Sequence, residues 1–321
     1  MKYKIFDCSN SPEKPEHRTN SNCPFQNDVM ADLKKYCPDD FEFVQSPENA
    51  EIIITNDVFP TGLINSTKLK IKRMDGIFWQ EQYKERNEPL NYSAQQADLV
   101  IFISKFSEES YFELYGQTLK KHVVVLNDAD ETLFYKHRNT NYTDHFVISA
   151  IASNWNRPEK RFNDLMNVMR RLKNEKYLLL LIGETPFNDF KELKVIPFGY
   201  VEDKTITNAI LNRSDVFVNL SYKDAAPKTV CQALRTHLPV VYANSGGVPE
   251  LVGEHGVAIA DNLDFKFEDK TPELDVHEII SGIKYIQGYY TRYKNKFVTQ
   301  TKSYKETVIN KYFNEIRKVI K

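Results

Sequence analysis

The sequence has few cysteines, almost no tryptophan, no long apolar run and no excess charge of either sign. Its 321 residues include 4 Cys, whose positions have neither metal-site nor disulfide-framework spacing, so we expect reduced thiols. Lys and Arg (43) balance Asp and Glu (44), and this balance excludes the basic surface of a nucleic-acid-binding protein. The longest aliphatic run, 178–182, is far shorter than the ~20 residues of a membrane span.

Two features bear on location. Residues 1–6 lack the apolar stretch of a secretory signal, which predicts a cytoplasmic protein. The Lys- and Tyr-rich stretch 284–321 is most simply the solvated faces of amphipathic helices, with a weak peripheral membrane contact as the alternative. Nothing in the sequence indicates an oligomeric state.

What the chain does contain is two rounds of short β-type runs that alternate with helix-length polar stretches. The runs are continuous in Ile, Leu and Val, as buried strands of parallel sheets are; examples are 51–55, 99–104, 177–182 and 216–220. This alternation predicts an α/β protein with two Rossmann-like domains whose parallel sheets face each other across a cleft. We expect domains at 1–143 and 144–300, and a C-terminal helix at 301–321 that crosses back to the first domain.

The segment with the most candidate ligand-binding residues follows the strand predicted at 216–220. Ligands of open parallel sheets bind at the carboxyl ends of the strands. Pro227 suits the first position of a helix, and the amides of Lys228 and Thr229 would then face the strand end. Such amides bind phosphate through unpaired donors and the helix dipole. The alternative is an ordinary strand-to-helix connection.

Two further segments follow strands of the same half. Arg157, Lys160 and Arg161 place three cations within five residues, which suits a diphosphate, or else a solvated basic turn. Gly246 and Gly247 bring backbone close to a ligand, or simply form a turn. Neither a Gly-x-Gly-x-x-Gly nor a P-loop pattern is present, so dinucleotide and P-loop sites lose their main support.

A larger set of residues shares its order and spacing with a known family. The set is Pro227-x-x-Val230-x-x-Ala233-Leu234, Leu238-Pro239-Val240-Val241 and Ser245-Gly246-Gly247-x-Pro249-Glu250-Leu251-Val252-Gly253. This pattern resembles the donor half of family 4 retaining glycosyltransferases, and the likeness is strongest over residues 146–261. It implies the GT-B architecture and a nucleotide-diphosphate sugar, linked to UDP, GDP or dTDP, as the co-substrate.

The resemblance also implies roles for residues of the second domain. Lys160, helped by Arg157 and Arg161, would neutralise the donor phosphates, and the amides of Lys228 and Thr229 would hold one of them. The turn Gly199-Tyr200-Val201 would flank the base. We expect no metal ion and no other cofactor, because protein cations perform this task in the family.

The acidic pair that marks the family falls on Asp224 and Gln232. By analogy Asp224, with Ala225 and Ala226 beside it, contacts the donor sugar and is catalytic together with Lys160, while Gln232 holds the ribose. Both positions carry Glu in the family pattern. Gln keeps a hydrogen-bond acceptor but loses the charge, which costs about 1 kcal/mol and predicts weak donor binding. The alternatives are a catalytically degenerate nucleotide- or glycan-binding scaffold and, more weakly, a nucleotide-sugar epimerase.

The acceptor falls to the first domain in this family. The resemblance implies transfer with retention of configuration to a glycan, glycolipid or protein-linked acceptor. Asn56 and Asp57 follow one predicted strand and Asp75 follows the next, so we expect them at the acceptor side, although Asp75 with Gly76 equally suits a plain turn.

Overall fold

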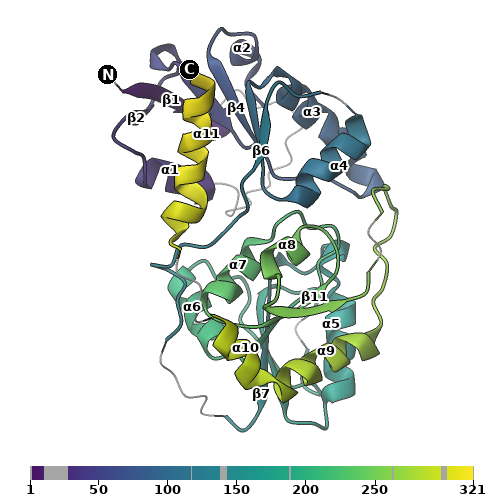
Figure 1. Ribbon diagram of the computed structural model, residues 1–321. Helices are drawn as coiled ribbons and strands as arrows, with labels where there is room; N and C mark the ends of the chain where they lie inside the picture. The colour runs from purple at the N-terminus through teal and green to yellow at the C-terminus, as the bar shows by residue number, and fades with distance from the viewer. Residues whose placement is uncertain are drawn as a thin grey trace. The chain divides into compact units, whose positions relative to one another are not determined.

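Two six-stranded parallel sheets make up the framework of the computed structural model, which describes residues 2–10, 28–116, 118–137, 143–187, 189–261, 264–297 and 302–320. Each sheet belongs to one of two units (Figure 1). Unit 1 is drawn from residues 1–126, 265–267 and 304–321, and unit 2 from residues 127–264 and 268–303. The predicted α/β class is therefore confirmed.

The sheet of unit 1 has the strand order β2-β1-β3-β4-β5-β6. Its strands are β1 (Tyr3–Asp7), β2 (Phe41–Val44), β3 (Ile52–Thr55), β4 (Leu69–Met74), β5 (Leu99–Phe102) and β6 (His122–Val124). Its α-helices are α1 (Asp28–Lys35), α2 (Thr61–Ile64), α3 (Asn87–Gln96), α4 (Lys105–Tyr115) and α11 (Asn310–Ile320). Short helical turns are η1 (Cys8–Asn10), η2 (Pro47–Asn49), η3 (Glu81–Arg86) and η6 (Lys305–Ile309). Both faces of the central strands are covered, which explains the continuous apolar runs of β3 and β5.

The last helix of the chain, α11, is part of unit 1. It lies beside α1 on one face of the sheet (Figure 1), where Tyr312 and Phe313 are fully buried. Arg317 forms two hydrogen bonds of 2.7 Å with Asp40, just before β2. The opposite face carries α2, α3 and α4, with Tyr111 of α4 buried in a second cluster. The C-terminal helix thus completes the core of the first sheet.

The sheet of unit 2 has the strand order β12-β11-β10-β7-β8-β9. Its strands are β7 (Phe146–Asn154), β8 (Tyr177–Glu184), β9 (Val195–Pro197), β10 (Val216–Asn219), β11 (Val240–Ala243) and β12 (Gly256–Ile259). The chain runs outward from β7 to β9 on one side, and then from β10 to β12 on the other. This is the six-stranded Rossmann order, whose direction reverses between β7 and β10.

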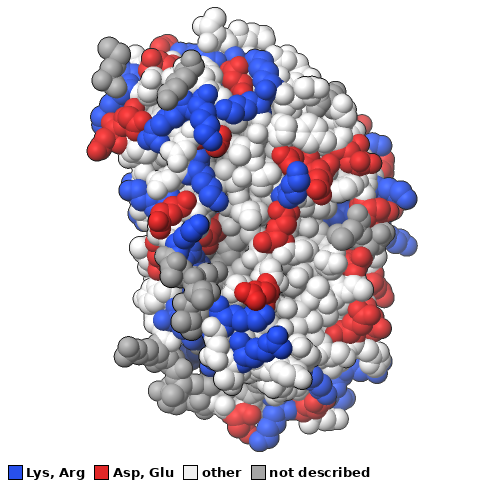
Figure 2. Space-filling view, in the orientation of Figure 1, with Lys and Arg blue, Asp and Glu red and all other residues white. Residues whose placement is uncertain are grey.

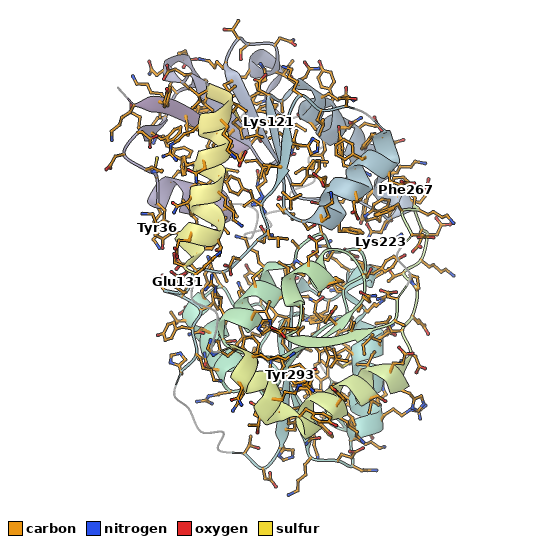
Figure 3. All side chains as sticks on the ribbon, in the orientation of Figure 1. Tyr36, Lys121, Glu131, Lys223, Phe267 and Tyr293 are labelled. Atoms are coloured by element: carbon orange, nitrogen blue, oxygen red, sulfur yellow. The ribbon has the colours of Figure 1, made fainter. Side chains whose placement is uncertain are left out.

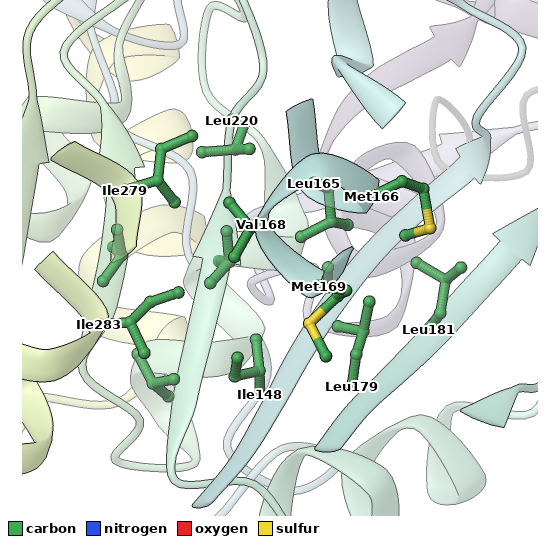
Figure 4. Close-up of a cluster of buried hydrophobic side chains, with 14 of the residues drawn as sticks. Ile148, Leu165, Met166, Val168, Met169, Leu179, Leu181, Leu220, Ile279 and Ile283 are labelled. Carbon is green, nitrogen blue, oxygen red and sulfur yellow. The ribbon is translucent and has the colours of Figure 1, made fainter. Parts of the chain in front are cut away.

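Helices cover both faces of this second sheet. They are α5 (Phe162–Leu172), α6 (Lys204–Asn212), α7 (Lys228–Arg235), α8 (Val248–Val252), α9 (Val276–Gly288) and α10 (Tyr290–Lys296), with a short turn η4 (Pro158–Lys160) before α5. Figure 4 shows α5 contributing Leu165, Met166 and Met169 to the core between the sheet and α9. On the other face, α6, α7 and α8 pack against Phe217 and Val240. The packing fixes where each strand ends, and therefore where its following loop lies.

The segment that precedes β7 packs on unit 2. The backbone N–H of His137 donates to Asn212 Oδ1 (2.7 Å), and Asn212 Nδ2 donates to the carbonyl of Tyr135 (2.8 Å). Both bonds join this segment to α6. The units therefore divide after Leu126 rather than near residue 143. The functional domains predicted at 1–143, 144–300 and 301–321 stay a proposal.

The described residues also bear on the cysteines and on membranes. Cys8, Cys37 and Cys231 are free thiols, and Cys23 lies outside the described residues. Burial, and then Asp7, raise the pKa of Cys8 to about 12, so this thiol stays protonated and unreactive at neutral pH. In the described part of the chain, no helix has the length and apolarity that crossing a bilayer requires. Basic and acidic side chains are intermingled on the face in Figure 2, in keeping with the net charge of −1.

Candidate functional site

The reversal of strand order in unit 2 brings two of the predicted loops together. β7 and β10 are paired neighbours, with Val216 opposite Ile148 and Phe217 opposite Ser149. The loop after β7 carries Lys160, and the loop after β10 carries Asp224. In open parallel sheets, the crevice at the carboxyl ends of the two strands at such a reversal is the usual ligand site. The sheet topology alone therefore points to these loops.

Lys160 and Asp224 form an ion pair at this position. Lys160 Nζ lies 2.7 Å from Asp224 Oδ2 and also donates a longer hydrogen bond of 3.4 Å to Ser221 Oγ. Their side chains are 14% and 22% exposed, so both remain reachable from solvent. A backbone bond of 2.8 Å from Tyr222 N–H to the carbonyl of Glu159 ties the two loops together. The result is a cation and a carboxylate held side by side at the carboxyl ends of β7 and β10.

The loop after β10 is fixed along its backbone by neighbouring elements. Lys223 N–H donates to Ser245 Oγ (2.9 Å), and Gly247 N–H donates to the carbonyl of Asp224 (2.9 Å). Asn127 Nδ2 donates to the carbonyl of Ala226 (2.8 Å). These bonds come from the segments that follow β11 and β6. The backbone of this loop is therefore held by hydrogen bonds within the protein.

Gly246 explains why the loop after β11 contains paired glycines. Its φ is +67°, and a Cβ atom there would lie 2.1 Å from the carbonyl oxygen of Asp224. Only glycine permits so close an approach of the two backbones. The close approach seen here is to the backbone of Asp224, and the approach to a ligand that we predicted for this glycine pair stays a prediction. All three predicted motifs meet around Asp224.

Helix α7 begins at Lys228, directly after this loop. Pro227 precedes the helix as its N-cap residue with ψ 121°, so the helix starts beside Pro227, as predicted. The first amides of a helix have no partner within it, and those of Lys228 and Thr229 are in this first turn. Gln232 lies one turn further along, 5% exposed, and its carboxamide makes no hydrogen bond with the described residues. The phosphate role of the two amides and the ribose role of Gln232 stay proposals.

The three cations after β7 have different surroundings. Arg161 is buried and forms a bidentate pair with Asp261 (2.7 and 2.8 Å), while its Nε donates to the carbonyl of Pro272. Its expected help with phosphate was therefore wrong, because Asp261 and Pro272 occupy its guanidinium. Arg157 is half-exposed and pairs with Glu159. Lys160 is thus the cation of this loop that lies beside Asp224.

The turn predicted to flank a base follows β9, at the edge of the same sheet. Gly199 has φ +66°, and its carbonyl accepts a hydrogen bond from Gly183 N–H (2.7 Å), which anchors the turn to the end of β8. Tyr200 is 40% exposed and Val201 is half-buried. The turn is two strands away from β7, and an elongated ligand would have to span that distance to touch both.

A comparison with protein families bears on this half of the chain. Residues 145–273 match the family model described as glycosyl transferases group 1. This segment is therefore similar to that glycosyltransferase family. The matched segment contains β7 to β12 of unit 2 and every residue of the ion-paired loops, so the resemblance read from residues 146–261 is confirmed.

Individual relatives agree with the glycosyltransferase assignment. The chain is 25% identical over 185 residues to an N-acetyl-alpha-D-glucosaminyl L-malate synthase of Bacillus anthracis. The match covers 53% of this chain and 47% of that enzyme, so it spans about half the length of the curated relative.

Solved structures establish the fold of the whole chain. A sucrose-phosphate synthase of Thermosynechococcus elongatus has a TM-score of 0.67 at 14% identity, over 99% of this chain and 88% of that one. Alr3699/HepE of Anabaena, solved in complex with UDP, has a TM-score of 0.67 at 16% identity, over 100% of this chain and 99% of that one. The fold is GT-B, as predicted.

The acceptor-side residues predicted in unit 1 lie at the carboxyl ends of neighbouring strands. Asn56 and Asp57 follow β3, and Asp75 follows β4. Asp75 Oδ1 is 2.6 Å from Nε of the buried Arg73. Burial lowers the pKa of Arg73, but Asp75 and then Tyr312 outweigh this effect and raise the pKa above its ordinary value. Asp75 is therefore part of a charged pair as well as a candidate for the acceptor, and the acceptor role of all three residues stays a proposal.

The hydrogen bonds that support the candidate site were not predicted from the sequence. Ser245 and Asn127 hold the Asp224 loop through side-chain hydrogen bonds to its backbone. Lys223, next to Asp224, has a left-handed backbone with φ 50°. Partners of this kind depend on loops far apart in the chain, and no local pattern marks them.

Proposed function

We propose that this protein transfers a glycosyl group from a nucleotide-diphosphate sugar to a hydroxyl group of a glycan, glycolipid or protein-linked acceptor, with retention of configuration. The observation that carries the proposal is the Lys160–Asp224 pair, 2.7 Å apart at the strand reversal of a glycosyltransferase-family sheet, directly before the first turn of α7. This arrangement supports the proposal because a sugar diphosphate would need positive charge and amides at its phosphates and a carboxylate at its sugar.

The first chemical requirement is stabilisation of the leaving group. The bond between the anomeric carbon and the β-phosphate oxygen breaks, and its electron pair leaves with the nucleoside diphosphate. Lys160 and the amides of Lys228 and Thr229 are preorganised to stabilise the charge that develops there. Lys160 already pairs with Asp224. When the donor binds, the Lys160 ammonium would contact the phosphate as well as, or instead of, the Asp224 carboxylate.

The second requirement is to place the sugar for attack. Asp224 would accept hydrogen bonds from sugar hydroxyls, and the small side chains of Ala225 and Ala226 would leave room for the ring. The acceptor oxygen forms its bond to the anomeric carbon on the face that the phosphate leaves, and its proton passes to the departing phosphate. This front-face course needs no protein nucleophile and gives retention.

The donor nucleotide is best sought among uridine diphosphates. Alr3699/HepE, with the same fold, was solved with UDP, and this motivates UDP-linked sugars before GDP- or dTDP-linked ones. Gln232 would hold the ribose and the turn Gly199-Tyr200-Val201 the base. Protein groups already supply the charge at the phosphates, so we propose no further cofactor.

The test is a panel of UDP-, GDP- and dTDP-sugars, first in a thermal-shift assay and then for transfer or hydrolysis. A donor at 100 times its Kd stabilises the fold by about 2.7 kcal/mol, which such an assay detects. Lys160→Met should lower the turnover of the best donor by about 100- to 1,000-fold, the effect of removing one preorganised donor. Lys176→Met is the matched control, because Lys176 forms an ion pair of 2.8 Å with Asp144 before the amino end of β8.

Three outcomes would contradict the proposal. One is no binding and no turnover with any nucleotide sugar. Another is nucleotide binding without transfer or hydrolysis, which would indicate a non-catalytic descendant. The third is unchanged turnover in Lys160→Met, which would show that Lys160 does not stabilise the leaving phosphate.

A further inference from the structure

The lysine that precedes Asp224 is buried, and its ammonium group is held by a separate set of partners. Lys223 has a side chain only 1% exposed, and its Nζ lies 3.1 Å from Asp264 Oδ1 and 3.5 Å from Glu268 Oε1. The same ammonium lies 4.8 Å from the centre of the Tyr222 ring. Tyr222 in turn donates its hydroxyl to Glu268 Oε1 (2.7 Å). Figure 3 labels Lys223 within unit 2.

This lysine also has an unusual backbone. Its φ is +50°, in the left-handed region that side-chain-bearing residues rarely adopt. Such a conformation persists only where the surroundings enforce it, and it clusters at functional sites. Two hydrogen bonds hold the backbone here. Ser245 Oγ accepts from Lys223 N–H, and Gly247 N–H donates to the carbonyl of Asp224.

The two observations are connected by geometry. The dihedral angles at residue 223 set the direction in which the chain enters Asp224, and therefore where the Asp224 carboxylate points. A side chain anchored at its far end by two carboxylates resists the rotation that would return its backbone to negative φ. The anchored side chain thus keeps Asp224 Oδ2 at 2.7 Å from Lys160 Nζ.

We propose that Lys223 is a positioning residue for the sugar-transfer site: through its anchored ammonium it maintains the left-handed turn that aims Asp224 at Lys160 and the donor sugar. The inference rests on the proposed function for its catalytic meaning. It assigns Lys223 no contact with the substrate. Asp264 and Glu268 contribute to the same positioning, because their carboxylates hold the Lys223 ammonium.

Two substitutions at this position separate the backbone effect from the charge effect. Lys223→Met removes the ammonium and keeps a side chain that disfavours positive φ. Lys223→Gly also removes the ammonium but adopts positive φ readily. Lys296→Met is the control, because Lys296 is a partly buried lysine of unit 2 that pairs with Glu254 at 3.3 Å.

The kinetic expectation is a split between binding and turnover. Lys223→Met should lower kcat for the best donor by about 30- to 100-fold, in line with the cost of a misplacement of about 1 Å. Its Kd for UDP should stay within about threefold of the parent protein, because Lys160 and the α7 amides are intact. Lys223→Gly should retain at least ten times the kcat of Lys223→Met, and Lys296→Met should match the parent protein.

A structural measurement tests the same inference without any activity. Crystal structures of the parent protein and Lys223→Met should show residue 223 leaving positive φ in the variant, with Lys160 Nζ and Asp224 Oδ2 more than about 4 Å apart. The inference is overturned if the variant keeps both the left-handed turn and the ion pair. It is also overturned if Lys223→Gly loses as much kcat as Lys223→Met, or if UDP affinity and kcat fall together.

Failure of the proposed function gives a different pattern. If the parent protein turns over no donor, the glycosyltransferase proposal fails while the two crystal structures still decide whether Lys223 sets the position of Asp224. If the parent protein is active and Lys223→Met is equally active, the positioning role alone is refuted.

Discussion

The contact between Gly246 and the backbone of Asp224 gives a sharp test of how strictly the site is preorganised. The perturbation is Gly246→Ala, which adds one methyl group. That Cβ would lie 2.1 Å from the carbonyl oxygen of Asp224, whereas real Cβ atoms essentially never come within 3.0 Å of another atom. The two loops must therefore separate by about 0.9 Å, and the collision is with backbone atoms that no rotamer change can move.

The expected size of the effect has two parts. A left-handed backbone costs a residue with a side chain about 1–2 kcal/mol, and losing the bond from Gly247 N–H to Asp224 costs about 1 kcal/mol more. Gly246→Ala should therefore lower the free energy of unfolding by about 2–3 kcal/mol. A shift of nearly 1 Å at a residue that positions the sugar should lower turnover about 100-fold.

Gly116→Ala is the matched control. Gly116 ends α4 with φ +58°, and a Cβ atom there would meet nothing within 4 Å. This variant carries the backbone strain without the collision, so it should lose about 1–2 kcal/mol and keep full turnover. Urea unfolding and a transfer assay measure both quantities. Equal losses of stability in the two variants, with full turnover in Gly246→Ala, would refute the reasoning.

Two other predictions concern charged groups away from the reacting atoms. Arg161→Met leaves the buried Asp261 without its partner and should lower the free energy of unfolding by about 3–5 kcal/mol; Lys176→Met, at an exposed pair, should leave urea unfolding unchanged, and equal effects would refute the burial argument. The hydrogen bond from Arg317 holds the pKa of Asp40 below its ordinary value of about 4, so Asp40 stabilises the fold above that value and loses its effect as pH falls through the lower folded-state pKa. Asp40→Asn should lower the free energy of unfolding by less than about 1 kcal/mol at pH 7, since the pair is largely exposed. At a pH below the folded-state pKa of Asp40, the substitution should have no effect on this free energy. A difference between the two proteins that grows toward low pH would contradict the lowered pKa.

Much of unit 2 was predictable because its elements are marked locally. The strands β8 and β10 are mostly apolar runs, and α7 begins directly after a proline that suits the start of a helix. A Rossmann-like domain implies a reversal of strand order, but the sequence did not identify β7 and β10 as the pair at the reversal, because strand order depends on pairing between distant segments. That reversal is what places Lys160 beside Asp224.

The elements that the sequence reading missed lack such marks. Strand β2 has four residues, lies at the edge of its sheet and is only partly buried, so its alternation is too short to stand out. Helix α3 contains Pro89 in its first turn and many polar residues, which favour a loop in a sequence-based reading. The two structural units divide after Leu126, and the contacts of residues 135–137 with Asn208 and Asn212 that join this segment to unit 2 have no mark in the sequence.

The role of Arg161 shows the same limit at the site itself. Three neighbouring cations predicted a shared phosphate site, but the partner that removes Arg161 from it, Asp261, is 100 residues further along the chain. Local spacing gives the kinds of residue at a strand end. The tertiary structure decides which of them face a ligand.

A crystal structure of the protein with bound UDP tests the central claim most directly. Lys160 Nζ is expected within about 3 Å of a β-phosphate oxygen, the range of a charge-assisted hydrogen bond, with the amides of Lys228 and Thr229 on the same diphosphate. UDP bound elsewhere on the molecule, or at this sheet edge with Lys160 turned away from both phosphates, would contradict the account.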